Sequence, residues 1–215
     1  MPARIDPALI PSSPDISIES ALWSHQIIRV AGLDEAGRGA WAGPVMAAAV
    51  ILPNQPEISA LLAGMRDSKE LNAQQRMEKA VLIRRHALAC AVGQADNQEI
   101  DQIGILPATR LAMYRALAGL ACSPEHLLID ALFLPDVEQP QTALIKGDQR
   151  SLSIAAASIL AKTERDAFML ASHEEFPDYG FDRHKGYGTR LHHQRLSEIG
   201  PCRLHRLSYK PLHEE

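Results

Sequence analysis

The feature that most constrains the fold is a pair of short apolar segments that each end in acidic residues. Residues 27–33 are mostly apolar and rich in β-branched side chains, and Asp34 and Glu35 follow them directly. Residues 126–129 form a second such segment, which ends at Asp130. Runs of this length and composition are typical of buried strands. A single acid at a strand end is usually a turn or cap residue. Two such positions predict a site, because ligands of open α/β sheets bind beyond the carboxyl ends of strands.

Further strands and helices are predicted around these two segments. We expect strands at residues 45–52, 87–94 and 143–145, and helices at 71–85, 106–120, 153–171 and 189–199. Two consecutive strands come first in this prediction, and later strands alternate with helices. This order indicates an α/β domain with a mixed sheet. Residues 1–24 contain four prolines and little apolar surface to bury. They are therefore predicted to be a flexible extension of a single domain that spans residues 25–215.

Composition narrows the class of protein. The longest apolar run, residues 45–52, is far shorter than the roughly 20 residues that span a bilayer, so we expect no membrane-spanning segment. The N-terminus lacks the apolar stretch of a signal peptide. The three cysteines are far apart and form no CxxC pair. A disulfide framework or a zinc site is therefore not expected, and the reducing cytoplasm is the predicted location.

The charge is distributed unevenly. The net charge is 22 − 26 = −4, but residues 183–213 hold seven basic side chains and one acid, which gives this segment +6 and the remainder −10. A basic patch on an acidic body indicates a possible nucleic-acid interface. A solvated charged surface would have the same composition, so charge alone does not decide between the two.

The predicted helix at residues 153–171 supplies further polar groups. Ser158, Lys162 and Asp166 are each four residues apart, so they share one face of the helix. An ordinary ion pair between Lys162 and Asp166 on the surface would have the same spacing.

If Asp166 converges with Asp34, Glu35 and Asp130, four carboxylates form one site without His or Cys. Oxygen ligands of this kind suit a hard divalent cation, Mg²⁺ or Mn²⁺. Without a cation the carboxylates would repel one another, and at least one would stay protonated. Two cations in such a site serve in-line phosphoryl transfer, in which they clamp the entering and leaving oxygens.

A glycine-rich loop follows the first predicted strand. The spacing of Gly37, Gly39 and Ala42 formally matches the dinucleotide-binding fingerprint. That fingerprint must open a helix, however, whereas Gly43 and Pro44 here lead directly into another predicted strand. A Rossmann-type dinucleotide site is therefore disfavoured.

Taken together, the motifs of the chain resemble those of type II ribonuclease H, the ribonuclease HII family. The motifs are GLDEAGRG (32–39), AGPV (42–45), DSKEL (67–71), LID (128–130), IAAASILAK (154–162), RD (165–166), YGF (179–181), HKGYGT (184–189) and HRLSY (205–209). They cover residues 27–211 in family order. The resemblance implies an RNase H-like fold, with a central mixed sheet flanked by helices and a helical C-terminal part.

The resemblance also implies an activity. The expected enzyme is a metal-dependent endoribonuclease that hydrolyses the RNA strand of RNA–DNA hybrids and cuts at single ribonucleotides embedded in duplex DNA. The expected products carry 5′-phosphate and 3′-hydroxyl ends. Mg²⁺ or Mn²⁺ is the implied cofactor, nucleic acid the implied partner, and the expected state is a monomer.

Individual roles carry over by position. Asp34, Glu35, Asp130 and Asp166 match the family's four catalytic, metal-binding carboxylates. Gly37, Arg38 and Gly39 match the loop that senses the ribonucleotide 2′-hydroxyl, and Tyr187 matches an aromatic residue that packs against the sugar at an RNA–DNA junction. The other expected substrate contacts are Lys69, Ser158, Lys162, His184, Lys185 and Thr189.

The chain departs from the family pattern at three positions: Ala131 replaces a usual Gly, Gly104 a usual Asn, and Trp41 a usual aliphatic residue. None of them is a carboxylate, so the expected activity stands. A catalytically silent hybrid-binding module is the alternative from another class, and it would need a broken carboxylate set. The related type III enzymes carry an added N-terminal domain, which 24 Pro-rich residues cannot form.

Overall fold

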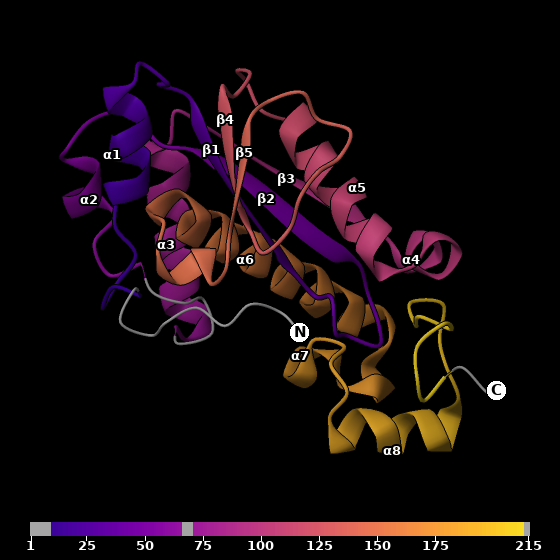
Figure 1. Ribbon diagram of the computed structural model, residues 1–215. Helices are drawn as coiled ribbons and strands as arrows, with labels where there is room; N and C mark the ends of the chain where they lie inside the picture. Colours follow the sequence, from indigo (N-terminus) through magenta and orange to yellow (C-terminus); the bar gives the residue numbers. More distant parts are fainter. Residues whose placement is uncertain (1–9, 66–70, 213–215) are drawn as a thin grey trace.

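The computed structural model describes residues 10–65 and 71–212. Its centre is a five-stranded sheet in the order β3-β2-β1-β4-β5 (Figure 1). The strands are β1 (Val30–Ala36), β2 (Val45–Ile51), β3 (Ala89–Ala95), β4 (His126–Asp130) and β5 (Gln141–Leu144). β1 pairs antiparallel with β2 and β2 with β3, whereas β1 with β4 and β4 with β5 are parallel. The predicted mixed sheet is therefore confirmed, and the carboxyl ends of β1, β4 and β5 lie at one edge.

Helices cover both faces of this sheet (Figure 1). They are α1 (Ser17–Ser24), α2 (Ile58–Leu61), α3 (Ala73–His86), α4 (Asn97–Ile103), α5 (Ile105–Ala118), α6 (Leu152–Glu175), α7 (Phe181–His184) and α8 (Arg190–Ile199), with short 3₁₀ turns η2 (Gly147–Gln149) and η3 (Pro177–Tyr179). α1, α3 and α6 contribute to one core and α4 and α5 to the other. The end of α6 joins η3, α7, α8 and the last residues in a separate helical part, as expected. No helix in the described ranges is long and apolar enough to cross a membrane.

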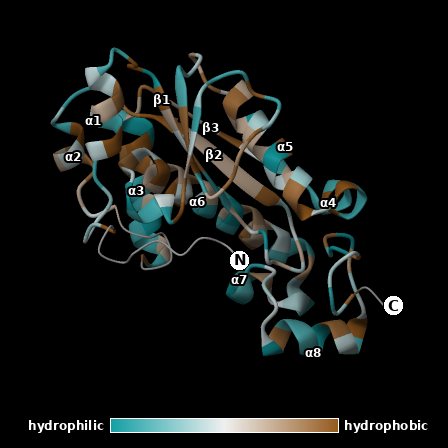
Figure 2. Cartoon of the chain, in the orientation of Figure 1, coloured by the Kyte–Doolittle hydropathy of each residue, from teal (hydrophilic) through white to brown (hydrophobic). Residues whose placement is uncertain are grey.

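Strand β2, which lies between β3 and β1, shows why the sheet is covered on both sides. Every residue of β2 is buried, which is typical of a strand between two helical layers. Its side chains alternate, with Ala48 and Val50 facing the α6 side and Ala47 and Ala49 facing the α5 side. Figure 2 shows the resulting hydrophobic centre beneath more polar outer helices. The small alanines allow both helical layers to approach closely.

The start of α6 lies directly against β1. A Cβ atom at Gly32 would lie 2.2 Å from the carbonyl carbon of Ser153, so only glycine fits there. Ser151 caps the helix by accepting a hydrogen bond from the Ile154 amide. The hydroxyls of Ser151 and Ser153 both donate to the buried carboxylate of Glu19 in α1.

Two parts of the chain differ from the sequence-based expectation. Part of the segment expected to be a flexible extension forms α1, with Trp23 only 6% exposed. The burial of α1 against the sheet and α6 offsets the conformational entropy that is lost when this segment is ordered. The prolines of the segment had suggested that no such burial occurs. Helix α4 was not predicted either; Asp96 caps its start, and Gly104 with φ of 81° separates it from α5.

Gly32→Ala should destabilise the protein by about 1–3 kcal/mol or more, because the added methyl meets backbone that cannot rotate away. Urea unfolding would measure the change in the free energy of unfolding. Gly39→Ala is the matched control, since nothing lies within 4 Å of a Cβ there, and it should change stability by less than about 0.5 kcal/mol. Equal stability of the two variants would contradict the close approach of α6 to β1.

Candidate active site

An acidic pocket of about 220 Å³ opens at the carboxyl ends of β1 and β4. It is lined by Asp34, Glu35, Ala36, Gly37, Arg38, Asp130, Asp148, Ser158, Lys162 and Tyr187. Three of the four predicted carboxylates therefore lie together. Asp34 and Glu35 lie within β1, which runs to Ala36, and not directly after the strand as expected. Ser158 and Lys162 reach the pocket from α6.

The pKa of Asp34 is changed both by burial and by the neighbouring acids of this acidic pocket. Its side chain is buried and accepts a hydrogen bond from the Glu35 amide at 2.7 Å. Burial raises the pKa of Asp34 well above its ordinary value, and the neighbouring charges of Glu35 and Asp130 raise it further. A hydrogen bond from Ser158 acts in the opposite direction. A positive charge in this pocket would therefore be strongly favoured.

Asp148 is a pocket residue that was not predicted. It lies in η2, shortly after β5, and is only 7% exposed. The Gly147 amide donates to Asp130 Oδ1 at 2.6 Å, so this turn is bonded directly to the acid that ends β4. The rule that found Asp34 and Asp130 also applies here, because β5 is parallel to β4. The signal was weak because the apolar run before Asp148 is very short.

The structure does not bring Asp166 into the acidic pocket. Its two carboxylate oxygens pair with Lys162 Nζ at 2.6 Å and Arg76 Nη2 at 3.1 Å. Asp166 lies eight residues after Ser158, which is about 12 Å along a helix, so sharing a helix face does not bring both side chains to one point. It lines a neighbouring pocket instead.

The acids of the pocket fit a divalent cation in their chemistry, since all are hard oxygen ligands. In the described ranges, no three His, Cys, Asp or Glu side chains already form a cluster that could hold one metal ion. The carboxylates surround the pocket without closing on a single point. Burial raises the pKa of Asp34, and the charges of Glu35 and Asp130 raise it further; a bound cation would oppose both effects.

A cationic pocket of about 580 Å³ lies beside the acidic one. Its charged lining residues are Arg76, Lys162, Arg183, Lys185 and Asp166, and it shares Lys162 and Tyr187 with the acidic pocket. Burial lowers the pKa of Lys185 from its ordinary value. Among the described residues, four cationic side chains and one acid line this pocket, which makes it suitable for an anion such as a phosphate.

Tyr187 lies at the boundary between the two pockets, because it lines both of them. Its ring is held between cations, with Lys162 Nζ 5.4 Å and Arg165 Cζ 5.1 Å from the ring centroid. The backbone around it is also fixed, because the Tyr187 amide donates to the His184 carbonyl at 2.9 Å.

The other predicted substrate residues have different surroundings. Gly39 is exposed but does not line either pocket. His184 is buried, and its ring bonds to the backbone of Tyr179 and Gly186. The Thr189 hydroxyl accepts from the His192 amide and caps α8. Lys69 lies outside the described residues.

Two buried arginines were missed as parts of the site, because arginine is rarely fully buried. Arg165 donates to the backbone carbonyls of Ala42, Pro44 and Lys185, all at 3.0–3.1 Å. Arg206 donates to the carbonyls of Gly43 and Arg38. Both side chains are 0% exposed, and both hold the loop that joins β1 to β2.

The basic segment 183–213 is only partly available to nucleic acid. Arg206 is buried, Arg203 pairs with Glu175, and Arg195 Nη1 lies 2.7 Å from Glu198. The count of charges in the sequence did not reveal these partners. Arg183 and Lys185 are the members that line the cationic pocket.

Ala131, which follows Asp130, adopts φ of 48°. This left-handed conformation costs a non-glycine residue about 1–2 kcal/mol. The strain explains in physical terms why a glycine suits this position, and it accompanies the turn that presents Asp130. The turn itself is kept by a bond from the Ala131 amide to the Leu144 carbonyl.

The order of the sheet and the helices on both of its faces define an RNase H-like fold. Solved structures with the same fold include ribonuclease H2 from Pyrococcus horikoshii, with a TM-score of 0.70, 23% identity and coverage of 86% of this chain and 95% of that one. A second is the ribonuclease HII in a complex with PCNA from Archaeoglobus fulgidus, with a TM-score of 0.71, 26% identity and coverage of 85% and 96%.

The chain belongs to the ribonuclease HII family, whose family model matches residues 31–212. The ribonuclease HII of Chloroflexus aurantiacus is 52% identical over 205 residues, which are 94% of this chain and 95% of that protein. The ribonuclease HII of Chlamydia muridarum is 50% identical over 187 residues, or 86% and 84%. The chain is thus a metal-dependent endoribonuclease that acts on RNA paired with DNA, and the silent binding module and the Rossmann protein are set aside.

A buried histidine pair behind Tyr187 should make stability depend on pH. His192 Nε2 and His205 Nε2 lie 3.0 Å apart, and burial lowers the pKa of each to about 4. An unfolded histidine has a pKa of about 6.5, so the unfolded state binds more protons between these values. Stability should therefore fall as the pH falls from about 6.5 toward 4, by up to about 1.4 kcal/mol per pH unit for each histidine.

Urea unfolding between pH 7 and pH 5 measures this slope. His192→Gln should flatten it, whereas His193→Gln, an exposed neighbour on the same helix, should leave it unchanged. A free energy of unfolding that is constant over this range in the wild type would refute the role of the pair.

Proposed function

We propose that this enzyme cuts the RNA strand of RNA–DNA hybrids and cleaves at single ribonucleotides in duplex DNA by a two-metal-ion mechanism. The observation that carries the proposal is the placement of Asp34, Glu35, Asp130 and Asp148 around one pocket, directly beside a cationic pocket. Acids that bind metal next to cations that bind phosphate are the two requirements of phosphodiester hydrolysis. The expected products keep the 5′-phosphate and the 3′-hydroxyl.

The metal ligands in this proposal are Asp34, Glu35, Asp130 and Asp148. Asp148 replaces Asp166 of the sequence-based set, because Asp148 lines the acidic pocket and Asp166 is paired with Lys162 and Arg76. Mg²⁺ or Mn²⁺ would supply the Lewis-acid stabilisation of the entering and leaving oxygens. A solved ribonuclease HIII with 25% identity was determined in complex with Mn²⁺, and this chain covers 71% of it, which supports a divalent metal.

The protein's own side chains supply position and charge. Lys162 lies between the two pockets and would hold the phosphate next to the cleaved one, together with Lys185 in the cationic pocket. The ring of Tyr187 would pack against the sugar at the RNA–DNA junction. Gly37, Arg38 and Gly39 would present backbone groups to the 2′-hydroxyl, which is the difference between RNA and DNA at the site.

Cellular location and assembly belong to the same proposal. All three cysteines are free thiols, which agrees with a reducing compartment such as the cytoplasm. One copy of the chain contributes both pockets, so a monomer is sufficient for the reaction.

The two aspartates distinguish this metal site from the one predicted by sequence. Asp148→Asn should reduce cleavage of a duplex with one ribonucleotide by at least about 100-fold, since a charged group that stabilises the transition state is lost. Asp166→Asn has the same change of charge and should retain most of the activity. Cleavage rates at saturating Mg²⁺ measure both. Loss of cleavage in Asp166→Asn but not in Asp148→Asn would restore the sequence-based set.

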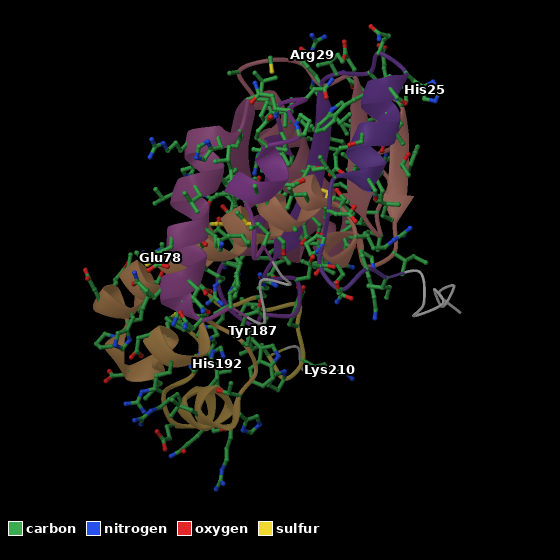
Figure 3. The ribbon with its side chains drawn as sticks, turned by 90° about the vertical axis from the view of Figure 1, so that its left-hand side faces the viewer. His25, Arg29, Glu78, Tyr187, His192 and Lys210 are labelled. Carbon is green, nitrogen blue, oxygen red and sulfur yellow. The ribbon has the colours of Figure 1, made fainter. Side chains whose placement is uncertain are left out.

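The cationic pocket should control the salt dependence of binding. Each phosphate that a duplex-binding protein neutralises contributes a slope of about −0.9 to log affinity against log salt. Lys185→Ala should make this slope shallower by up to about one unit. Arg29→Ala is the control, because Arg29 pairs with Glu125 at the other end of the sheet, far from Tyr187 (Figure 3). Equal slopes for Lys185→Ala and the wild type would remove Lys185 from the interface.

A further inference from the structure

The glycine loop, residues 37–43, is hydrogen-bonded to residues 206 and 209 of the C-terminal segment 203–209. The Arg38 carbonyl accepts two hydrogen bonds, from the Tyr209 hydroxyl at 2.8 Å and from Arg206 Nη1 at 2.9 Å. Arg206 Nε donates to the Gly43 carbonyl at 3.0 Å, so one guanidinium joins the two ends of the loop. The Arg206 amide also donates to the Trp41 carbonyl. Each contact except the Tyr209 hydroxyl comes from a fully buried residue.

Helix α4 in turn fixes this C-terminal segment. Asp101 accepts from the Leu207 amide at 2.9 Å, the Ser208 amide at 3.0 Å and the Ser208 hydroxyl at 2.6 Å. Asn97 donates to the carbonyls of Arg203 and His205. The position of Tyr209 is therefore set by a helix that contributes no residue to either pocket.

The direction of one carbonyl determines the direction of the next amide. Arg38 and Gly39 are joined by a trans peptide, which is planar, so the Arg38 C=O and the Gly39 N–H point in opposite directions. Because the carbonyl is drawn toward Tyr209 and Arg206, the Gly39 N–H is turned away from the C-terminal segment. Gly39 is exposed, and its neighbours Gly37 and Arg38 line the acidic pocket.

We propose that Tyr209 and Arg206 are positioning residues for ribonucleotide recognition, which act by fixing the orientation of the Arg38–Gly39 peptide. This inference rests on the proposed role of the glycine loop in sensing the 2′-hydroxyl. Neither residue lines the acidic or the cationic pocket, so their effect reaches the substrate through the loop. The affected property is the preference for a ribonucleotide over a deoxyribonucleotide.

The test is Tyr209→Phe, which removes one hydroxyl and keeps the ring. Binding is measured without divalent metal, so that nothing is cut, to two duplexes of one sequence, one all DNA and one with a single ribonucleotide. The ratio of the two affinities should fall about 3- to 10-fold, the equivalent of one hydrogen bond. Affinity for the all-DNA duplex and the midpoint of thermal unfolding should not change.

The matched control is Tyr114→Phe. The Tyr114 hydroxyl donates to Asp136 at 3.0 Å in a separate pocket on α5, so this variant should keep the wild-type ratio. Asp101→Asn weakens the bonds that hold residues 207 and 208, and it should lower the ratio in the same direction as Tyr209→Phe.

Two results would overturn the inference: an unchanged ratio in Tyr209→Phe, or an equal loss of affinity for both duplexes. An unchanged ratio in Asp101→Asn would overturn the part assigned to α4. A wild type that binds both duplexes equally would instead contradict the proposed recognition of the 2′-hydroxyl itself. The wild-type measurement therefore separates failure of the proposed function from failure of this inference.

Discussion

The close contact between β1 and α6 is the constraint on which the rest of the structure depends. With no side chain at Gly32, the first turns of α6 lie on the sheet, and residues 152–161 are buried throughout. That contact fixes where each later turn of the helix lies. Ser158 reaches Asp34, Lys162 follows one turn later, and Arg165 and Met169 extend past the sheet into the C-terminal helical part. One helix thereby aligns the acids, the cations and the loop supports.

Charge separation is the second organising principle. The acids at the strand ends are crowded and partly buried, which is unfavourable in the protein alone. The cations lie a few turns away along α6 and in the segment that follows it, with Lys162 between the two groups. Asp166 forms ion pairs with Lys162 and Arg76, and these pairs keep the two cationic side chains in place. The proposed phosphodiester substrate matches this arrangement, with its negative charge on the cations and the proposed metal ligands beside it.

The sequence predicted those features that depend on local pattern. Short apolar runs and their composition located all five strands, and the strand-end rule located Asp34 and Asp130. The rule failed for Asp148 because β5 has few apolar residues, and helix spacing favoured Asp166 because it describes a face and not a distance. Burial of Arg165 and Arg206 was not predictable, since their partners are backbone carbonyls far away in sequence. Helix α1 was missed because its contacts are also distant in sequence.

The tether between the glycine loop and residues 203–209 has a consequence for the growing chain. Synthesis proceeds from the N-terminus, so the loop emerges early, and the residues that hold it emerge more than 160 positions later. Asp130 and Asp148 also appear well before Tyr209 does. On the ribosome, the acids of the pocket could therefore gather before the loop acquires its final shape. If the loop senses the 2′-hydroxyl as proposed, selectivity for ribonucleotides is the last property that the folding chain gains.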